Sequence, residues 1–415
     1  MSHIQRIPET DLEAFIHIVA NAYPGIELAS DEKRQTFLQR LIDIQQNTED
    51  TQLYGLYRND KLVGGMRLFD FMMTLFETPT LVGGVGLVAV DLLHKKEKVA
   101  KEMIEFFLQH YRERGACLTA LYPFRLNFYK QMGFGYGPKM NQYRLPPSQL
   151  PRGPGKVHVD FLSKDDQQHM LECYNRYTRA THGMMERATK VFDVLFEAPE
   201  NTMIGYRKEG TIQGYLIFSA NTGRNFTLNE IEVKELVYET RDVLMELMTF
   251  LHSQADQFQT IVFHTLDEDF HYLPTIPAND SHNIMPHAYH ETNTSGVGLM
   301  YRVINTASLF HVLQNHQFGP QTCTLKLTID DPFLPENQGS LVIHFNAGKP
   351  SLTDQADHEV AIHMSISAFS SLIMGVVSFK RLYEYGQATV SDHQYLHTVN
   401  ALFVTDQKPV CMTRF

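Results

Sequence analysis

The segment at residues 128–134, FYKQMGF, combines residue types that could transfer a proton. It follows a strand-like segment at 116–122 and a short Pro-Phe-Arg-Leu-Asn connection. Gly133 is typical of a residue that ends a short helix, so Tyr129 would face a site formed by the preceding strand. A phenol with a pKa of about 10 is a poor base but can donate a proton. Tyr129 is therefore a candidate general acid, and the alternative is an aromatic side chain that packs the helix against a sheet.

A second candidate site lies where an apolar strand runs into a lysine-rich turn. Residues 83–90, GGVGLVAV, predict a buried strand, and an amphipathic helix is expected at about 99–114. Lys95, Lys96 and Lys98 lie between them. Unpaired backbone N–H groups and the helix dipole both favour a phosphate at a helix N-terminus. The turn could hold a pyrophosphate, and the alternative is a solvated charged connection.

These two segments need a sheet and helices to position them. Apolar residues recur at helical spacing in 11–22 and 31–44, and a tight turn at Asn59-Asp60 predicts a strand hairpin after them. The strands of this region are expected at 52–57, 62–71, 83–90 and 116–122. With the helix at 99–114 they predict a β-α-β unit, followed by the Tyr129 helix.

The sequence repeats itself at an offset of 149 residues. Tyr57 and Gly65 correspond to Tyr206 and Gly214 at that offset, which predicts two hairpins of the same length and register. Strands at 229–236 and 260–265 and a helix at 241–254 continue the second copy. The order of elements in the first region therefore recurs.

Breaker-rich segments divide the chain into three expected domains, at 1–150, 151–290 and 291–415. The last is expected to be α+β, with helices near 307–315 and 366–371, strands at 323–329, 340–345 and 359–365, and a final apolar strand. The fold class is thus α+β or mixed α/β. His282, His287 and His290 lie in a predicted loop at 273–296 that lacks a rigid frame for a metal, so no metal site is expected.

Composition narrows the class of protein. The formal net charge of −11 argues against a nucleic-acid partner and favours small cationic partners such as amines. The four cysteines lie far apart and suggest neither a zinc site nor a disulfide framework. The start of the chain has acids where a signal peptide would be apolar, and the apolar run at 371–379 is too short to span a bilayer. A cytoplasmic protein without a membrane association is expected.

The order of these elements, the strand LVAV at 87–90, the turn after it and the FYKQMGF segment together resemble the GNAT superfamily of N-acetyltransferases. Members bind acetyl-CoA through a Gln/Arg-x-x-Gly-x-Gly/Ala turn. They often have a tyrosine that acts as the general acid in a segment such as Phe-Tyr-x-x-x-Gly-Phe. Two GNAT-like regions followed by an α+β domain resemble, over essentially the whole chain, the enhanced-intracellular-survival (Eis) group. The last domain of that group resembles sterol carrier proteins.

The resemblance implies acetyl-CoA as cosubstrate and assigns residues to it. Val88 and Val90 would offer backbone groups to the pantetheine arm and the acetyl carbonyl. The residues implied at the pyrophosphate are Lys95, Lys96, Lys98, Val99 and Ala100. In the second GNAT-like region, the turn at 234–240 is acidic and contains no glycine. This region is therefore expected not to bind CoA.

The resemblance also implies a direct transfer of acetyl to a primary amine of a small cationic substrate, such as an aminoglycoside, a polyamine or a lysine side chain. Tyr129 would protonate the leaving thiolate, and the chain-terminal carboxylate of Phe415 would be the base. The last eight residues carry no trailing polar tail, which fits a fixed chain end, although a hydrophobic anchor is the alternative for Phe415. A homo-oligomer is implied, often a hexamer in this group.

Lys98 departs from the family pattern because it replaces the turn glycine. We expect Lys98 to keep a helical φ with its ammonium outward, so that its amide stays available to phosphate. A distorted turn is the alternative. In that case the chain would be a non-catalytic protein that binds CoA or a lipid.

Overall fold

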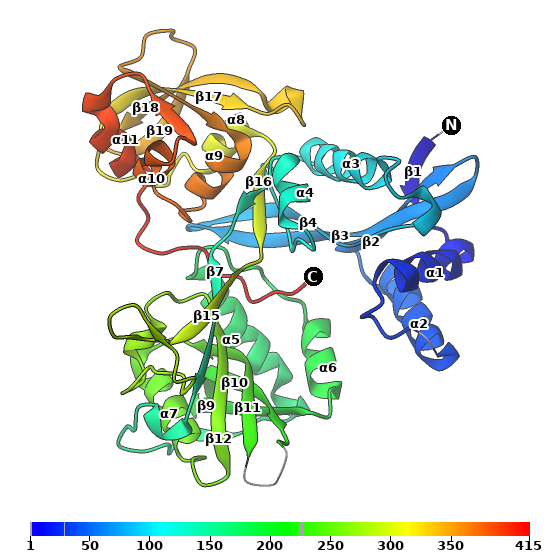
Figure 1. Cartoon of the computed structure of the whole chain (residues 1–415), viewed down its shortest axis with the longest axis vertical. Coiled ribbons are helices and arrows are strands. Elements are labelled where there is room, and N and C mark those ends of the chain that lie inside the picture. Colours follow the sequence, from blue (N-terminus) through cyan, green and yellow to red (C-terminus); the bar gives the residue numbers. More distant parts are fainter. Residues whose placement is uncertain (1, 29, 224–227) are drawn as a thin grey trace. The chain divides into compact units, whose positions relative to one another are not determined.

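The computed structural model describes residues 2–28, 30–223 and 228–415 (Figure 1). Contacts divide the chain into two compact units. The first comprises Met1–Gly137, Leu299–Lys408 and Arg414–Phe415, and the second comprises Pro138–Gly298 and Pro409–Thr413. The domain boundaries expected after residues 150 and 290 stay a prediction.

The first unit is built on a seven-stranded sheet in the order β1-β2-β3-β4-β5-β16-β6. Its strands are β1 (Ser2–Arg6), β2 (Thr51–Arg58), β3 (Lys61–Leu75), β4 (Thr78–Val90), β5 (Leu118–Leu121), β6 (Gly135–Tyr136) and β16 (Met300–Val303). The pair β4–β5 is parallel, as a β-α-β unit requires, and the pairs that join the other neighbours are antiparallel.

Helices cover both faces of this sheet. They are α1 (Leu12–Ala22), α2 (Asp31–Asn47), α3 (Val99–Glu113) and α4 (Leu126–Gln131). The apolar stripe of α3 packs on one face with Val63, Val85 and Met300, and α1 and α2 pack on the other with Leu53 and Ala89. Figure 1 shows α3 on the opposite side of β2 and β3 from α1 and α2. The expected helices, strands and β-α-β order of this region are confirmed.

The two hairpins of the repeat correspond at an offset of 150, so the offset of 149 is wrong for their register. Arg58 pairs with Lys61 in the first hairpin, and Lys208 pairs with Thr211 in the second. The matching side-chain types favoured 149, but the turn fixes the register, because its two central residues have positive φ in each copy. A slip of one residue would turn each apolar side chain to the other face.

The second unit holds another seven-stranded sheet, in the order β15-β7-β12-β11-β10-β9-β8. Its strands are β7 (Lys139–Leu145), β8 (Val159–Phe161), β9 (Asn201–Lys208), β10 (Thr211–Asn221), β11 (Asn229–Tyr238), β12 (Phe258–Thr265) and β15 (Asn293–Val297), with helices α5 (Gln167–Arg179), α6 (Thr189–Glu197) and α7 (Arg241–His252). Residues 273–296, expected to be a loop, contain a small hairpin of β13 (Ile284–Met285) and β14 (Tyr289–His290) and most of β15. The recurrence of the β-α-β order is confirmed.

The C-terminal third of the chain forms a five-stranded sheet in the order β19-β18-β17-β20-β21. Its elements are β17 (Cys323–Asp330), β18 (Gly339–Asn346), β19 (Lys349–Thr353), β20 (Val360–Ser365) and β21 (Ala388–Val390), with α8 (Thr306–Val312), α9 (Ile366–Ile373), α10 (Phe379–Glu384) and α11 (Leu396–Leu402). The expectation of a final apolar strand is wrong: residues 403–415, all of them described, contain no strand. Apolar composition there reflects packing of an extended chain end. No helix within the described residues is both long and apolar enough to cross a bilayer.

Candidate active site

Strand β4 is interrupted by a bulge just before its end. Gly65 of β3 pairs with Ala89, whereas Arg67 pairs with Gly86, so Leu87 and Val88 together oppose a single residue of β3. Leu87 has a φ of +51°. Bulges of this kind re-aim a strand and are over-represented beside active sites.

The bulge coincides with the end of the pairing between β4 and β5. These strands are paired only from Val82 opposite Leu118 to Val85 opposite Leu121. Beyond Val85, none of the described strands pairs with residues 86–90 of β4 on the β5 side. Backbone N–H and C=O groups on that side are therefore available to another molecule.

Val88 and Val90 lie on this open edge. The Asp91 N–H donates to the Val63 carbonyl at 2.9 Å, and alternate residues of an antiparallel strand turn their polar groups to the neighbour. Val90 therefore turns its N–H and C=O away from β3. The Val88 carbonyl also points away from β3, since it accepts a hydrogen bond of 2.7 Å from the Tyr23 hydroxyl. Sequence reasoning missed Tyr23, because nothing in its neighbourhood signals a partner 65 residues away.

Lys98 takes the backbone conformation that a glycine would take. It is the residue before the first turn of α3 and has a φ of +65°. The expectation that Lys98 keeps a helical φ is wrong, because the chain reverses here from the strand direction into the helix. The left-handed conformation costs a non-glycine residue roughly 1–2 kcal/mol. Lys96 has a similar φ of +68°.

The N-terminus of α3 is open and locally positive. The Glu102 N–H donates to the Lys98 carbonyl at 3.0 Å, so the amides of Val99 and Ala100 have no acceptor within the helix. Lys95, Lys96 and Lys98 are exposed, and none of them makes an ion pair with a carboxylate in the part of the chain that the structure describes.

The carboxylate inside this turn, that of Glu97, is paired with basic side chains. Glu97 binds His94 at 2.9 Å and Arg58 at 2.7 Å. The hydrogen bond from His94, with the positive charges of His94 and Arg58, lowers the pKa of Glu97. The turn therefore presents lysine charge to a ligand without an unpaired competing carboxylate at Glu97.

Tyr129 lies on α4 with its side chain almost fully buried, at 5 % exposure. Burial raises the pKa of Tyr129, and the proximity of Tyr23 raises it further. The phenol therefore stays protonated at neutral pH, as a proton donor must. Gly133 ends the helix as expected: its φ is +85° and its N–H donates to the Lys130 carbonyl at 3.0 Å.

The chain end lies against β4 immediately before the bulge. A Cβ on Gly86 would lie 3.0 Å from the carboxyl carbon of Phe415. The Phe415 ring lies 5.5 Å from that of Phe69, 4.8 Å from that of Phe71 and 5.2 Å from that of Tyr122. A side chain at position 86 would crowd this approach, and the aromatic cluster holds the terminal residue.

The structure thus gathers the predicted residues around one stretch of β4. Val88 and Val90 are part of it, and the α3 turn follows directly in the chain. Tyr129 belongs to the core on the α3 face of the sheet. Phe415 lies on the other face, because Gly84 and Gly86, which it touches, alternate with Gly83, which touches Tyr111 of α3.

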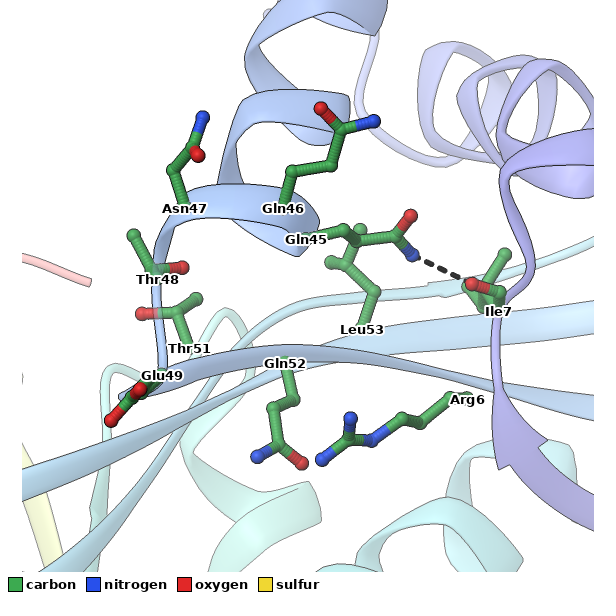
Figure 2. Close-up of a pocket in the computed structure, with 10 residues that line it drawn as sticks. All are labelled: Arg6, Ile7, Gln45, Gln46, Asn47, Thr48, Glu49, Thr51, Gln52 and Leu53. Carbon is green, nitrogen blue, oxygen red and sulfur yellow. Dashed lines mark hydrogen bonds between the residues drawn. The ribbon is translucent and has the colours of Figure 1, made fainter.

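Two other features do not join this site. A hollow of about 530 Å³ at the end of α2 is lined by Arg6, Ile7, Gln45, Gln46, Asn47, Thr48, Glu49, Thr51, Gln52 and Leu53 (Figure 2). None of the predicted site residues lines it. Among the described residues no group of three or more His, Cys, Asp or Glu side chains is placed to hold a metal.

In the second unit, the connection from β11 to α7 corresponds to the lysine-rich turn between β4 and α3, and its structure is different. The connection from β11 to α7 is two residues long, and the Thr240 side chain caps α7 by accepting from the Val243 N–H. Beside the bulge of β11, Glu235 is buried in an ion pair with Arg187 at 2.8 Å. The acidic turn expected from the sequence is therefore a short capped turn without a row of free lysines. That this unit does not bind CoA stays a prediction.

Comparisons with known proteins agree with this architecture. Residues 3–137 match an acetyltransferase (GNAT) domain model, residues 183–303 match a second acetyltransferase (GNAT) domain model, and residues 311–412 match a sterol carrier protein domain model. No curated protein sequence matches the chain.

Solved structures share the fold over the whole chain. A GCN5-related N-acetyltransferase from Anabaena variabilis has 15% identity and a TM-score of 0.81, and a probable N-acyltransferase from Enterococcus faecalis has 20% and 0.81. Eis1 from Mycobacterium abscessus has 16% identity and a TM-score of 0.78. In each case 100% of both chains is covered.

The chain therefore carries two domains of the GNAT acetyltransferase family followed by a sterol carrier protein domain. It is an acetyl-CoA-dependent acetyltransferase, and it shares the fold of Eis1 and of the other two solved structures.

Proposed function

We propose that this protein transfers acetyl from acetyl-CoA to a primary amine of a small cationic substrate by direct attack. Aminoglycosides, polyamines and lysine side chains are the acceptor classes to test. The observation that carries the proposal is the position of the Phe415 carboxyl group against Gly86, beside the bulge and the open edge of β4.

The residues around β4 suit acetyl-CoA. Val88 and Val90 supply backbone groups to the pantetheine arm and the acetyl carbonyl. When acetyl-CoA binds, the Val88 carbonyl either gives up its hydrogen bond from Tyr23 or accepts from both partners. The open amides of α3 at Lys98, Val99 and Ala100 suit the pyrophosphate. Lys95 and Lys96 add charge. The glycine-like φ of Lys98 supports a working turn over a damaged one.

Acetyl-CoA supplies the acetyl group, and two groups of the first unit transfer the protons: the main-chain carboxylate of Phe415 and the phenol of Tyr129. The Phe415 carboxylate accepts a proton from the ammonium of the acceptor, which frees the nitrogen lone pair to form the new C–N bond. As the C–S bond breaks, Tyr129 donates its proton to the sulfur. Holding both reactants at β4 makes the reaction effectively unimolecular.

Thiol release measures this activity directly. We expect the purified protein to release CoA thiol from acetyl-CoA when a polyamine, an aminoglycoside or a lysine peptide is added. Calorimetry with acetyl-CoA alone separates binding from turnover. No thiol release with any amine, despite normal acetyl-CoA binding, would count against catalysis and favour a CoA-binding protein without activity.

We also propose a homo-oligomer in the cytoplasm, with a hexamer as the first assembly to test. All four cysteines are described, and each is buried and outside any disulfide, which suits a reducing compartment. Light scattering after gel filtration measures the mass in solution, and a mass equal to one 47.7 kDa chain would contradict an oligomer.

A further inference from the structure

Arg67 lies on the face of the sheet that carries the chain end. It pairs with Leu53 of β2 on one side and with Gly86 of β4 on the other. Residues directly opposite in adjacent strands project on the same face. Arg67 therefore projects on the face of Gly86 against which the Phe415 carboxyl group lies.

The Arg67 side chain is largely buried and has no counter-charge. Its guanidinium lies over the Phe69 ring at 4.5 Å, and its Nε is buried without a hydrogen-bond partner. Within the described residues no carboxylate, the terminal group of Phe415 included, forms an ion pair with Arg67. Burial and, to a smaller extent, repulsion from Arg40 lower the pKa of Arg67 to about 10.

Arg40 belongs to α2, which packs on this same face of the sheet with Leu53, and its positive charge repels that of Arg67. It is exposed, and it too makes no ion pair with a described carboxylate. Elsewhere in the described chain, the buried arginines Arg302 and Arg187 are each bound by an acid. Keeping the Arg67 charge largely buried without an acid is costly, and the nearby charge of Arg40 adds to that cost.

We infer that Arg67 and Arg40 bind an anionic group of the acceptor, a carboxylate or a phosphate, and thereby select amines that carry such a group. The inference rests on the proposed function and narrows its acceptor class. The Phe415 carboxyl group lies against Gly86, the residue of β4 directly opposite Arg67, so the two groups are close enough for a small acceptor to reach both. An acceptor with a short chain between amine and anion would place the amine near the Phe415 carboxylate and the anion at Arg67.

Matched acceptors test this selectivity. Lysine and 1,5-diaminopentane differ by one carboxylate, and O-phosphoethanolamine and ethanolamine differ by one phosphate. We expect kcat/KM from thiol release to be about 10-fold or more higher for the anionic member of at least one pair, since charge-assisted hydrogen bonds are the strong ones. The pair that shows the larger ratio identifies the anion as carboxylate or phosphate. Ratios near one in both pairs would overturn the inference.

Two variants locate the effect. Arg67→Gln and Arg40→Gln should each raise KM for the anionic acceptor about 10-fold while changing kcat/KM for the matched acceptor without the anion less than about 2-fold. Lys33→Gln is the control, because Lys33 is also an exposed cation of α2 but pairs with Glu27. Arg40 is exposed, so Arg40→Gln should fold even if Arg67→Gln does not. A selectivity that survives Arg40→Gln and a folded Arg67→Gln would place the anion elsewhere.

Calorimetry separates this inference from the proposed chemistry. With CoA present, lysine or O-phosphoethanolamine should bind the unaltered protein, and the affinity should fall about 10-fold in Arg67→Gln. This result supports the anion site even if no amine releases thiol, an outcome that would defeat only the proposed acetyl transfer. Equal binding by the unaltered protein and Arg67→Gln, with acetyl-CoA affinity unchanged in both, would overturn the anion site.

Discussion

At the scale of single residues, the proposed mechanism depends on two groups from opposite ends of the chain. Tyr129 is a buried phenol whose raised pKa keeps its proton available. Phe415 is useful through its main-chain carboxyl group rather than its side chain, which acts as an anchor among Phe69, Phe71 and Tyr122. Each can be altered without touching the other.

Tyr129→Phe removes the hydroxyl and keeps the ring. We expect kcat to fall about 100-fold or more, because general-acid catalysis contributes roughly 10²–10⁴-fold, while the affinity for acetyl-CoA changes little. Thiol-release kinetics and calorimetry measure the two quantities. Phe128→Leu, on the same helix, is the control for a change in packing. Full turnover in Tyr129→Phe would remove the phenol from the mechanism.

Extension of the chain by two glycines beyond Phe415 moves the carboxylate and leaves every side chain in place. We expect kcat to fall about 100-fold, for the same reason of lost proton transfer, with acetyl-CoA binding preserved. Phe415→Leu keeps a terminal carboxylate with a smaller anchor, so it should lose less activity than the extended chain. If the extended protein turned over at the original rate, the terminal carboxylate would not be the base.

At the scale of elements, the bulge of β4 and the turn before α3 act together in the proposed site. The bulge ends the pairing with β5 and frees the strand edge, and the turn brings the open end of α3 next to it. The turn needs a left-handed residue at position 98, and Lys98 supplies it at a conformational cost.

Substitutions at Lys98 separate charge from conformation. Lys98→Gly and Lys98→Ala both remove the ammonium, but only glycine adopts the left-handed conformation without strain. We therefore expect Lys98→Gly to be more stable than Lys98→Ala by about 1 kcal/mol in thermal or urea unfolding. Both should bind acetyl-CoA somewhat more weakly than the original protein. Equal stability of the two variants would contradict the φ of Lys98.

At the scale of the whole molecule, the first unit joins parts of the chain that are far apart in sequence. Strand β16 enters the first sheet between β5 and β6. Its Arg302 forms a fully buried ion pair with Asp331, at 3.1 and 2.7 Å, next to the end of β17. This pair links the first sheet to the C-terminal third within the same unit.

Asp331→Ala leaves the Arg302 charge buried without a partner. We expect a loss of about 3–5 kcal/mol in the unfolding free energy of this unit, the usual cost of breaking a buried pair. The double variant Arg302→Met/Asp331→Leu removes both charges and should recover much of the loss. Circular dichroism during urea unfolding measures both. A double variant no more stable than Asp331→Ala would show that the charge is not the cause.

The sequence by itself determined the local elements and the class of fold. Apolar spacing located α3 and β4, Asn59-Asp60 located the first hairpin turn, and Gly133 located the end of the Tyr129 helix, because each depends on residues close together in the chain. The register of the two hairpins was not predicted correctly. Similar residue types match at an offset of 149, but the positions of the two turns set the offset at 150.

Only the tertiary structure decided which distant residues meet. Tyr23 binds the Val88 carbonyl, the Phe415 carboxyl group lies against Gly86, and the buried Arg67 Nε has no hydrogen-bond partner among the described residues. None of these has a periodic or spacing signal, since each arises where separate segments pack on one stretch of sheet. The sequence alone therefore identifies an acetyltransferase fold with a candidate acid and base, and their surroundings follow from the way that sheet, helices and chain end come together.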